Sequence, residues 1–190
     1  LVPGWDEASS LGALELVARY PRLAAAVGVH PHAAAETDDA GWARTAALAG
    51  HPAVVGIGET GLDYDRRFSP IDDQLVNLRR NLALALATGK PAILHCRSAA
   101  GQRDAQDALL AEMRGAGFGL PAARASFGDR PPAILHSLSG PVDYVEAALE
   151  LVTQSVRQFL QISVDKNDFP GLFVSGHPKR QHGPSPAIQR

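Results

Sequence analysis

Short apolar runs alternate with longer amphipathic stretches along the first 150 residues, and this alternation restricts the possible folds more than any other feature. The runs are rich in Val, Ile and Ala, are too short for helices, and are bounded by Pro or Gly. Strands separated by helices favour a parallel sheet, because each helix carries the chain back to the start of the next strand. The predicted strands are 24–29, 53–57, 92–95 and 133–136.

The stretches between these runs carry helix boundary signals. The clearest helix is predicted to begin with Ser69 as its N-cap and Pro70 as its first residue, and to end at Gly89. Its core-facing stripe is Ile71, Gln74/Leu75, Leu78, Leu82 and Leu86. The other predicted helices are 6–19, 38–49, 98–114 and 141–152. Residues 115–132 are expected to form a surface loop.

The composition changes near residue 150, which predicts two parts in the chain. Residues 1–150 contain 31 alanines, whereas only Ala187 follows them. The last stretch is also rich in Gln and ends in a segment with many Pro, Gly and charged residues. We therefore expect an α/β domain over residues 1–150 and a divergent, partly disordered tail over residues 151–190.

Charge and cysteine content exclude several classes of protein. The formal net charge is -2, so there is no large basic excess of the kind that marks general nucleic-acid or membrane-surface binders. The single cysteine, Cys96, excludes disulfide-stapled scaffolds and cysteine-rich zinc sites. No apolar stretch approaches the roughly 18 to 20 residues that cross a bilayer. We expect a soluble cytoplasmic protein with no membrane partner.

Each predicted strand leads to a side chain that can bind metal. These side chains are His30, Glu59, His95 and His136, and the last two end an identical PAILH pentapeptide. The carboxyl ends of parallel strands open onto one face, so the four side chains should converge there. Imidazole nitrogens and carboxylate oxygens suit divalent ions, and the two oxygens of Glu59 could bridge two of them. The sequence therefore predicts a metal site at this edge.

Several motifs around these residues resemble the TatD family of metal-dependent hydrolases. The most specific is GETGLDY within the segment VVGIGETGLDY at 54–64, followed by ILHCR at the end of the segment 69–97. GVHPH at 28–32 and ILHSLSG at 134–140 fit the same pattern. The resemblance covers about residues 5 to 150 and rests on the motifs rather than on periodicity.

The resemblance implies a (β/α)8 TIM-like barrel, of which this chain would form a part, carrying two divalent ions such as Mg, Mn or Zn. It implies a deoxyribonuclease that hydrolyses phosphodiester bonds with metal-activated water, acting on single-stranded DNA or DNA ends. Glu59, His95 and His136 match the family's metal ligands. His30 matches a family histidine that lies beside the metals, where it would contact the substrate phosphate. Arg97 follows His95 by two residues and would offer its planar guanidinium to the same phosphate.

The sequence also departs from the family pattern. A late aspartate that would serve as ligand and base is not recognisable, so the catalytic acid–base residue stays unknown. Asp165 and Asp168 are the only acids after residue 150, and neither follows an apolar strand. The chain also begins after the family's His-x-His strand. A truncated, inactive fragment and a related amide or lactone hydrolase therefore remain alternatives, and the oligomeric state is left open.

Neighbouring residues receive simpler interpretations. Cys96 should pack against helices as a small apolar side chain. Asp63 and Tyr64 are expected on the loop that follows Glu59, and His32 could lie at the rim of the site or on the surface. Trp5 is expected to pack between a helix and the sheet.

Overall fold

The structure, a computed structural model, describes residues 1–136, 138 and 140–153. The predicted alternation of helices and strands is present throughout this part of the chain. In order, the elements are β1 (Val2–Pro3), α1 (Glu7–Arg19), β2 (Ala25–Val27), the 3₁₀ helix η1 (Pro31–Ala33), α2 (Asp39–Leu48), β3 (Val54–Asp63), α3 (Ile71–Thr88), β4 (Ala92–Arg97), α4 (Asp104–Gly115), α5 (Pro121–Phe127), β5 (Ala133–Leu135) and α6 (Val142–Val152).

The five strands form one parallel sheet in the order β1-β2-β3-β4-β5, which is also their order in the chain. Every pair of neighbouring strands runs parallel, so each connection brings the chain back along the sheet. The predicted α/β fold with parallel strands is confirmed. Within the described residues the sheet is open, because β1 and β5 are not paired with each other to close a barrel.

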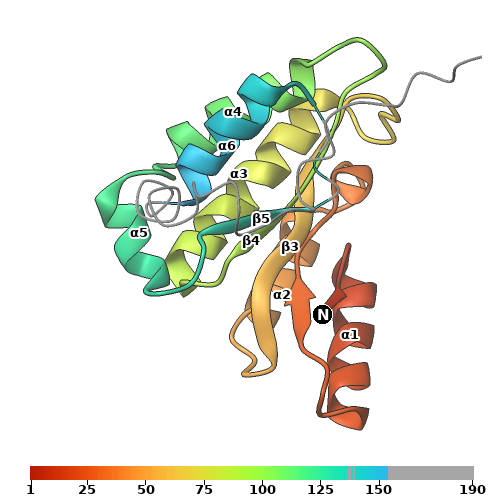
Figure 1. Cartoon of the computed structure of the whole chain (residues 1–190). Coiled ribbons are helices and arrows are strands. Elements are labelled where there is room, and N and C mark those ends of the chain that lie inside the picture. The colour runs from red at the N-terminus through yellow and green to blue at the C-terminus, as the bar shows by residue number, and fades with distance from the viewer. Residues whose placement is uncertain (137, 139, 154–190) are drawn as a thin grey trace, which may run out of the picture. The chain divides into compact units, whose positions relative to one another are not determined.

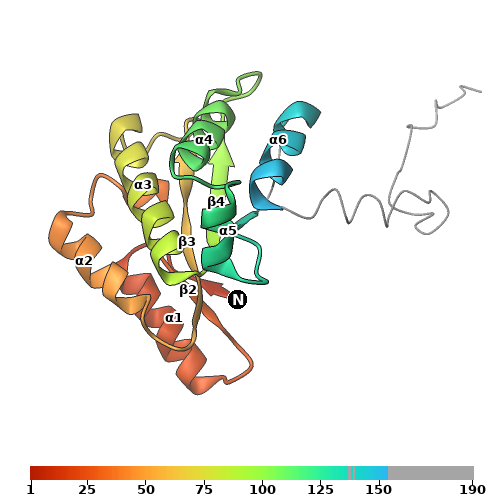
Figure 2. The ribbon, with the colours of Figure 1, turned by 90° about the vertical axis from the view of Figure 1, so that its left-hand side faces the viewer.

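The core lies between the sheet and its helices. Figure 2 shows α3 and α4 in front of β3 and β4, and each helix contacts the strand that it covers. The largest fully buried apolar side chains of this layer include Leu62, Leu78, Leu82, Leu94, Leu109 and Met113. Burying each of these side chains contributes roughly 1.5–3 kcal/mol, so the layer fixes the strands whose ends carry the polar residues.

Local signals explain most element boundaries. Asp6 caps α1, because its side chain accepts a hydrogen bond from the Ser9 backbone N at 2.7 Å. In return, the Ser9 hydroxyl oxygen accepts a hydrogen bond from the Asp6 backbone N, which completes a capping box. Gly89 ends α3 with a left-handed φ of 64°, a conformation that favours glycine. The prediction that Ser69 is the N-cap of α3 is wrong. Pro70 holds that position, and it makes no side-chain cap hydrogen bond.

Four elements differ from the sequence prediction. β3 continues past the predicted end at residue 57 to Asp63, so the acidic end of this segment is strand and not loop. Within the predicted loop 115–132, residues Pro121–Phe127 form α5. The chain begins with the short strand β1, which was not predicted, and α4 starts at Asp104 and not at residue 98.

The described helices also bear on the membrane prediction. None of them combines the length and the apolar character that a bilayer-spanning helix needs. The prediction of a tail over residues 151–190 falls almost entirely on residues 154–190, which lie outside the described part of the chain.

Candidate metal centre

The predicted site residues come together at the carboxyl ends of the strands. His30 follows β2, Glu59 lies on β3, His95 lies on β4, and His136 follows β5. Their placement follows from the parallel sheet, since all strands end on the same side. The His136 backbone N donates to the Leu94 carbonyl at 3.2 Å, which extends the pairing of β5 with β4 to the edge of the site.

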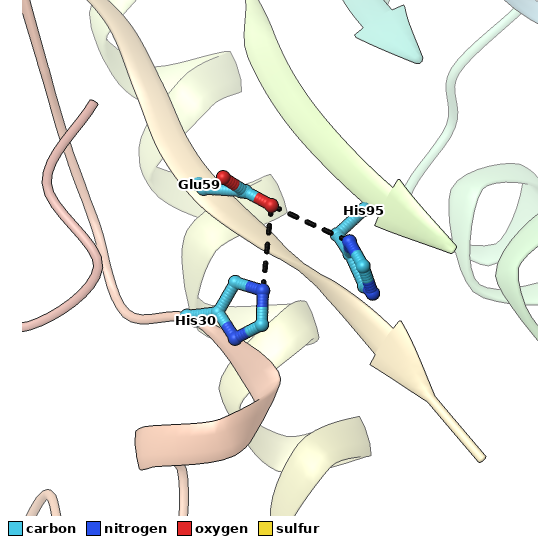
Figure 3. A group of neighbouring side chains, drawn as sticks. All are labelled: His30, Glu59 and His95. Carbon is cyan, nitrogen blue, oxygen red and sulfur yellow. Dashed lines mark ion pairs between the residues drawn. The ribbon is translucent and has the colours of Figure 1, made fainter. Parts of the chain in front are cut away.

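One carboxylate oxygen is the centre of this group. Glu59 Oε1 lies 3.3 Å from His30 Nε2, 3.4 Å from His95 Nδ1 and 2.6 Å from His136 Nε2. Figure 3 shows the imidazoles of His30 and His95 on two sides of the Glu59 carboxylate, each joined to it by a dashed line. Three imidazoles from three strand ends therefore surround one oxygen atom.

The donor atoms of this group are close enough to share a metal ion. Ligand atoms of His30, Glu59 and His95 all lie within 4.8 Å of one another. The Nε2 atom of His95 is buried and makes no hydrogen bond within the described residues, and the acid that it faces is Asp63, whose Oδ2 lies 3.4 Å away. A buried imidazole nitrogen without a hydrogen bond is costly unless an ion or ligand binds it. The nitrogen and oxygen donors, and this buried nitrogen beside a second carboxylate, fit a divalent ion.

The tautomer of His30 distinguishes it from the other imidazoles. Its Nδ1 accepts a hydrogen bond from the backbone N of His32 at 3.1 Å, so Nδ1 carries no proton. A neutral imidazole then has its proton on Nε2, the atom that faces Glu59. His30 is therefore arranged to donate a hydrogen bond from Nε2, whereas a metal ligand would need a free lone pair there.

Asp63 is a second carboxylate at the site, and sequence reasoning placed it on a loop. It ends β3, and its side chain is fully buried. Its Oδ2 lies 2.7 Å from His32 Nε2, 3.4 Å from His95 Nε2 and 3.7 Å from an Arg97 guanidinium nitrogen. His95 thus faces a carboxylate with each of its two ring nitrogens. The signal that could have revealed Asp63 is its spacing, since residues four apart in an extended strand, such as Glu59 and Asp63, lie on the same face.

His32 and Arg97 also contact this second carboxylate. Of the two positions considered for His32, the structure shows the rim, where its ring contacts Asp63. The Arg97 side chain is 42% exposed, so its guanidinium borders the site and reaches solvent. This position suits the predicted phosphate contact, which stays a prediction.

The electrostatics of the two acids follow from these contacts. Hydrogen bonds from His30 and then His95 hold the pKa of Glu59 far below its usual range, although burial opposes the shift. For Asp63, burial raises the pKa, but the backbone N–H of Arg66 and the side chain of His32 outweigh it, and the pKa is lowered. Burial lowers the pKa of His30. Both carboxylates are therefore ionised near neutral pH, and His30 is neutral.

Cys96 lies next to His95 in sequence and takes no part in the cluster. It is partly buried and packs against the hydrophobic core, and burial raises the pKa of its thiol to about 12. The thiol is thus protonated near neutral pH and is a poor metal ligand. Its packing agrees with the prediction of a small apolar residue.

Some predictions about the site fall outside the described residues. Asp165 and Asp168, the only acids after residue 150, are among them, as is any late aspartate that would act as a base. The acid–base residue therefore stays unknown.

Comparison with known proteins agrees with the motifs. The family model described as TatD related DNase matches residues 1–167. The chain is 34% identical over 152 residues to a protein named 3'-5' ssDNA/RNA exonuclease TatD from Edwardsiella piscicida, covering 80% of this chain and 52% of that protein. It is 42% identical over 100 residues to the protein of the same name from Yersinia pseudotuberculosis, covering 52% and 38% of the two chains.

A solved structure shows the same fold. The crystal structure of YJJV, a TatD homolog from Escherichia coli K12, matches with a TM-score of 0.63 and 25% sequence identity. The match covers 78% of this chain and 52% of that chain. The chain thus spans about half, or less, of the length of these relatives.

Proposed function

Because this chain belongs to the TatD-related DNase family, we propose that its cluster of imidazoles and carboxylates binds divalent metal ions and supports hydrolysis of phosphodiester bonds in single-stranded nucleic acid. The relatives named above are exonucleases that act on single-stranded DNA and RNA. The observation that carries the proposal is the convergence of three imidazoles on one oxygen of Glu59. The activity is proposed, since the chain spans about half of those relatives.

Glu59, His95 and His136 are the proposed metal ligands. Glu59 has a second carboxylate oxygen, which allows it to bridge two ions. Their mixed nitrogen and oxygen donors favour Mn or Zn, while Mg prefers oxygen alone. When bound, the ions would polarise a phosphoryl oxygen and lower the pKa of a water molecule, so that hydroxide is available near neutral pH.

His30 and Arg97 are the proposed substrate contacts. The His32 backbone engages Nδ1 of His30, which leaves the proton on Nε2. This proton faces Glu59 Oε1, which lies 3.3 Å from Nε2, and we propose that the proton turns to a phosphate oxygen when a metal ion engages Glu59. The Arg97 guanidinium offers a planar set of donors that matches a phosphate group. Asp63 orients Arg97 and His32 through its Oδ2 atom and is proposed as a positioning residue.

Metal titration combined with a nuclease assay tests this assignment. We expect the whole chain to bind Mn²⁺ in a calorimetric titration and to degrade a single-stranded oligonucleotide when Mn²⁺ is present. Glu59→Gln removes a ligand and should weaken Mn²⁺ binding by at least about 100-fold, since even residues that only orient ligands cost 10–100-fold. Glu146→Gln, an exposed residue on α6, is the matched control and should bind Mn²⁺ normally.

The variant His30→Gln tests whether His30 donates a hydrogen bond to the substrate or binds the metal ion. As a donor, His30 should be dispensable for the metal, so the variant should bind Mn²⁺ within about threefold of the wild type while cleavage falls by roughly 10- to 100-fold. His51→Gln, exposed in the turn before β3, should change neither property. Loss of Mn²⁺ binding in His30→Gln would make His30 a ligand. Metal binding without cleavage by the wild type would favour the inactive fragment.

A further inference from the structure

A short exposed loop lies directly beside the site. Residues 65–68 lie within the connection from β3 to α3, and all four are exposed. They include two arginines and Phe68, whose side chain is 68% exposed. The loop leaves the carboxyl end of β3, the edge at which the metal-site residues gather. An exposed aromatic ring next to two cations, at this edge, is a combination that nucleic acids recognise through base stacking and phosphate contacts.

Both ends of this loop are fixed to the site. At its start, Asp63 Oδ1 accepts hydrogen bonds from the backbone N atoms of Asp65 at 3.2 Å and Arg66 at 2.9 Å. At its end, the buried Ser69 hydroxyl donates to the His32 carbonyl at 3.0 Å and accepts from the Ala35 backbone N at 3.1 Å. The loop is therefore held in place before any substrate arrives, which lowers the entropic cost of binding.

The ring of Phe68 is also in contact with the cluster. Its centroid lies 4.7 Å from that of His32, with the two planes at 84°. The His32 ring in turn lies 4.4 Å from the His30 ring and bonds to Asp63. An edge-to-face contact of this kind orients Phe68 while most of its surface stays exposed. The His32 ring thus lies between the Phe68 ring and the His30 ring and contacts both.

The arginines supply charge at the same place. The Arg66 side chain is 59% exposed, and its nearest acidic partner, Asp65, lies 3.7 Å away in a solvent-exposed pair. Arg67 donates from Nε to the Tyr64 carbonyl at 2.8 Å, which fixes this guanidinium along the loop. Exposed ion pairs are weak, so Arg66 can exchange Asp65 for a phosphate at little cost.

From these contacts we infer that residues 65–68 form a nucleotide subsite, in which Phe68 stacks on a base of a single-stranded nucleic acid and Arg66 faces its phosphate backbone. The inference rests on the proposed function and adds to it the part of the substrate that is held next to the cleaved bond. Stacking on an aromatic ring tolerates any base, so the subsite would favour single strands without selecting a sequence.

Steady-state cleavage of a fluorescent oligothymidylate by the whole chain with Mn²⁺ tests the subsite. Phe68→Ala should raise KM by roughly tenfold and leave kcat within about twofold, because a stacked base is held equally before and during the reaction. Phe68→Trp should keep the wild-type KM. Leu120→Ala, which removes another exposed apolar side chain remote from the strand ends, is the control.

An abasic oligonucleotide of the same length makes the test specific. If Phe68 stacks on a base, the wild type and Phe68→Ala should cleave the abasic strand with the same KM. Wild-type Mn²⁺ affinity and far-UV circular dichroism in Phe68→Ala would establish that the site and the fold are intact. Equal KM values for the wild type and Phe68→Ala on oligothymidylate would overturn the subsite alone. A wild type that neither binds nor cleaves the strand would overturn the proposed function and the subsite together.

Discussion

The two acidic residues of β3, Glu59 and Asp63, differ in which groups hold their carboxylates in place. Glu59 is contacted through one oxygen by three imidazole side chains, and its side chain is 20% exposed. Asp63 is fully buried, with one oxygen bonded to two backbone N–H groups and the other facing His32, His95 and Arg97. Side-chain partners can rearrange around an incoming ion, whereas backbone partners cannot. The contrast agrees with the proposed roles of Glu59 as a metal ligand and of Asp63 as a positioning residue.

The largest expected effect comes from removing the buried acid. Asp63→Ala should lower the free energy of unfolding by about 2–3 kcal/mol, because two backbone N–H groups and the His32 ring lose their acceptor. Glu59→Ala should cost less than this in the metal-free protein, because the partners of Glu59 are side chains that can turn toward water once the carboxylate is gone. Urea unfolding measures both, with the exposed Asp129→Ala as control. Equal losses would remove the distinction between the two acids.

A smaller effect is expected at the far end of the loop that Asp63 begins. Ser69→Ala should lower the free energy of unfolding by about 1 kcal/mol, since the buried hydroxyl makes one hydrogen bond as donor and one as acceptor. Urea unfolding again gives the value, and Ser126→Ala on α5, where the side chain is exposed, serves for comparison. A loss well below that of Asp63→Ala would show that the acid dominates the anchoring of the loop.

The smallest effect on stability is expected at Arg97. Its guanidinium lies 3.7 Å from Asp63 and is 42% exposed, so Arg97→Gln should change the free energy of unfolding by less than about 0.5 kcal/mol. The same variant should raise KM for a single-stranded oligonucleotide. Arg114→Gln, exposed on α4, is the matched control for both measurements. A large loss of stability would mean that Asp63 depends on Arg97 more than on the backbone.

The sequence predicts the convergence of the site because strand ends are readable from apolar runs. Each of His30, Glu59, His95 and His136 follows or lies in such a run, and a parallel sheet brings their ends to one edge. What each residue does is a separate matter, since spacing does not reveal the hydrogen bond from the His32 backbone that sets the His30 tautomer. The roles as ligand or substrate contact therefore remain proposals.

The sequence prediction puts Asp63 on a loop because the apolar run ends at residue 57, whereas β3 continues to Asp63. The strand in fact continues through the glycines, where Gly61 lets β3 approach β4 closely; a Cβ at this position would collide with the His95 carbonyl. One clue was present in the predicted helix stripe. Gln74 occupies a core-facing position there, and it is buried because its amide bonds to both backbone polar groups of Asp63. A polar residue in an apolar stripe indicates a buried polar partner.

Other differences have similar local causes. Ser69 looked like a helix cap by its position before Pro70, but its hydroxyl is used to join the loop to His32. The sequence does not predict helix α5, because the glycines and prolines around it favour loops. Trp5 was expected between a helix and the sheet, yet it is 52% exposed, while its carbonyl accepts a hydrogen bond from the His30 backbone N.

The strand order of the sheet has a consequence for how the protein is made. Because each new strand pairs with the one before it, a chain leaving the ribosome can add every strand to an edge that has already formed. The residues around Glu59 then arrive in the order of synthesis, and His136 comes last, after β5 docks on β4. A nascent chain that has not yet released β5 therefore carries a Glu59 with only two of its three imidazole neighbours, and His136 is the last of the three to reach it.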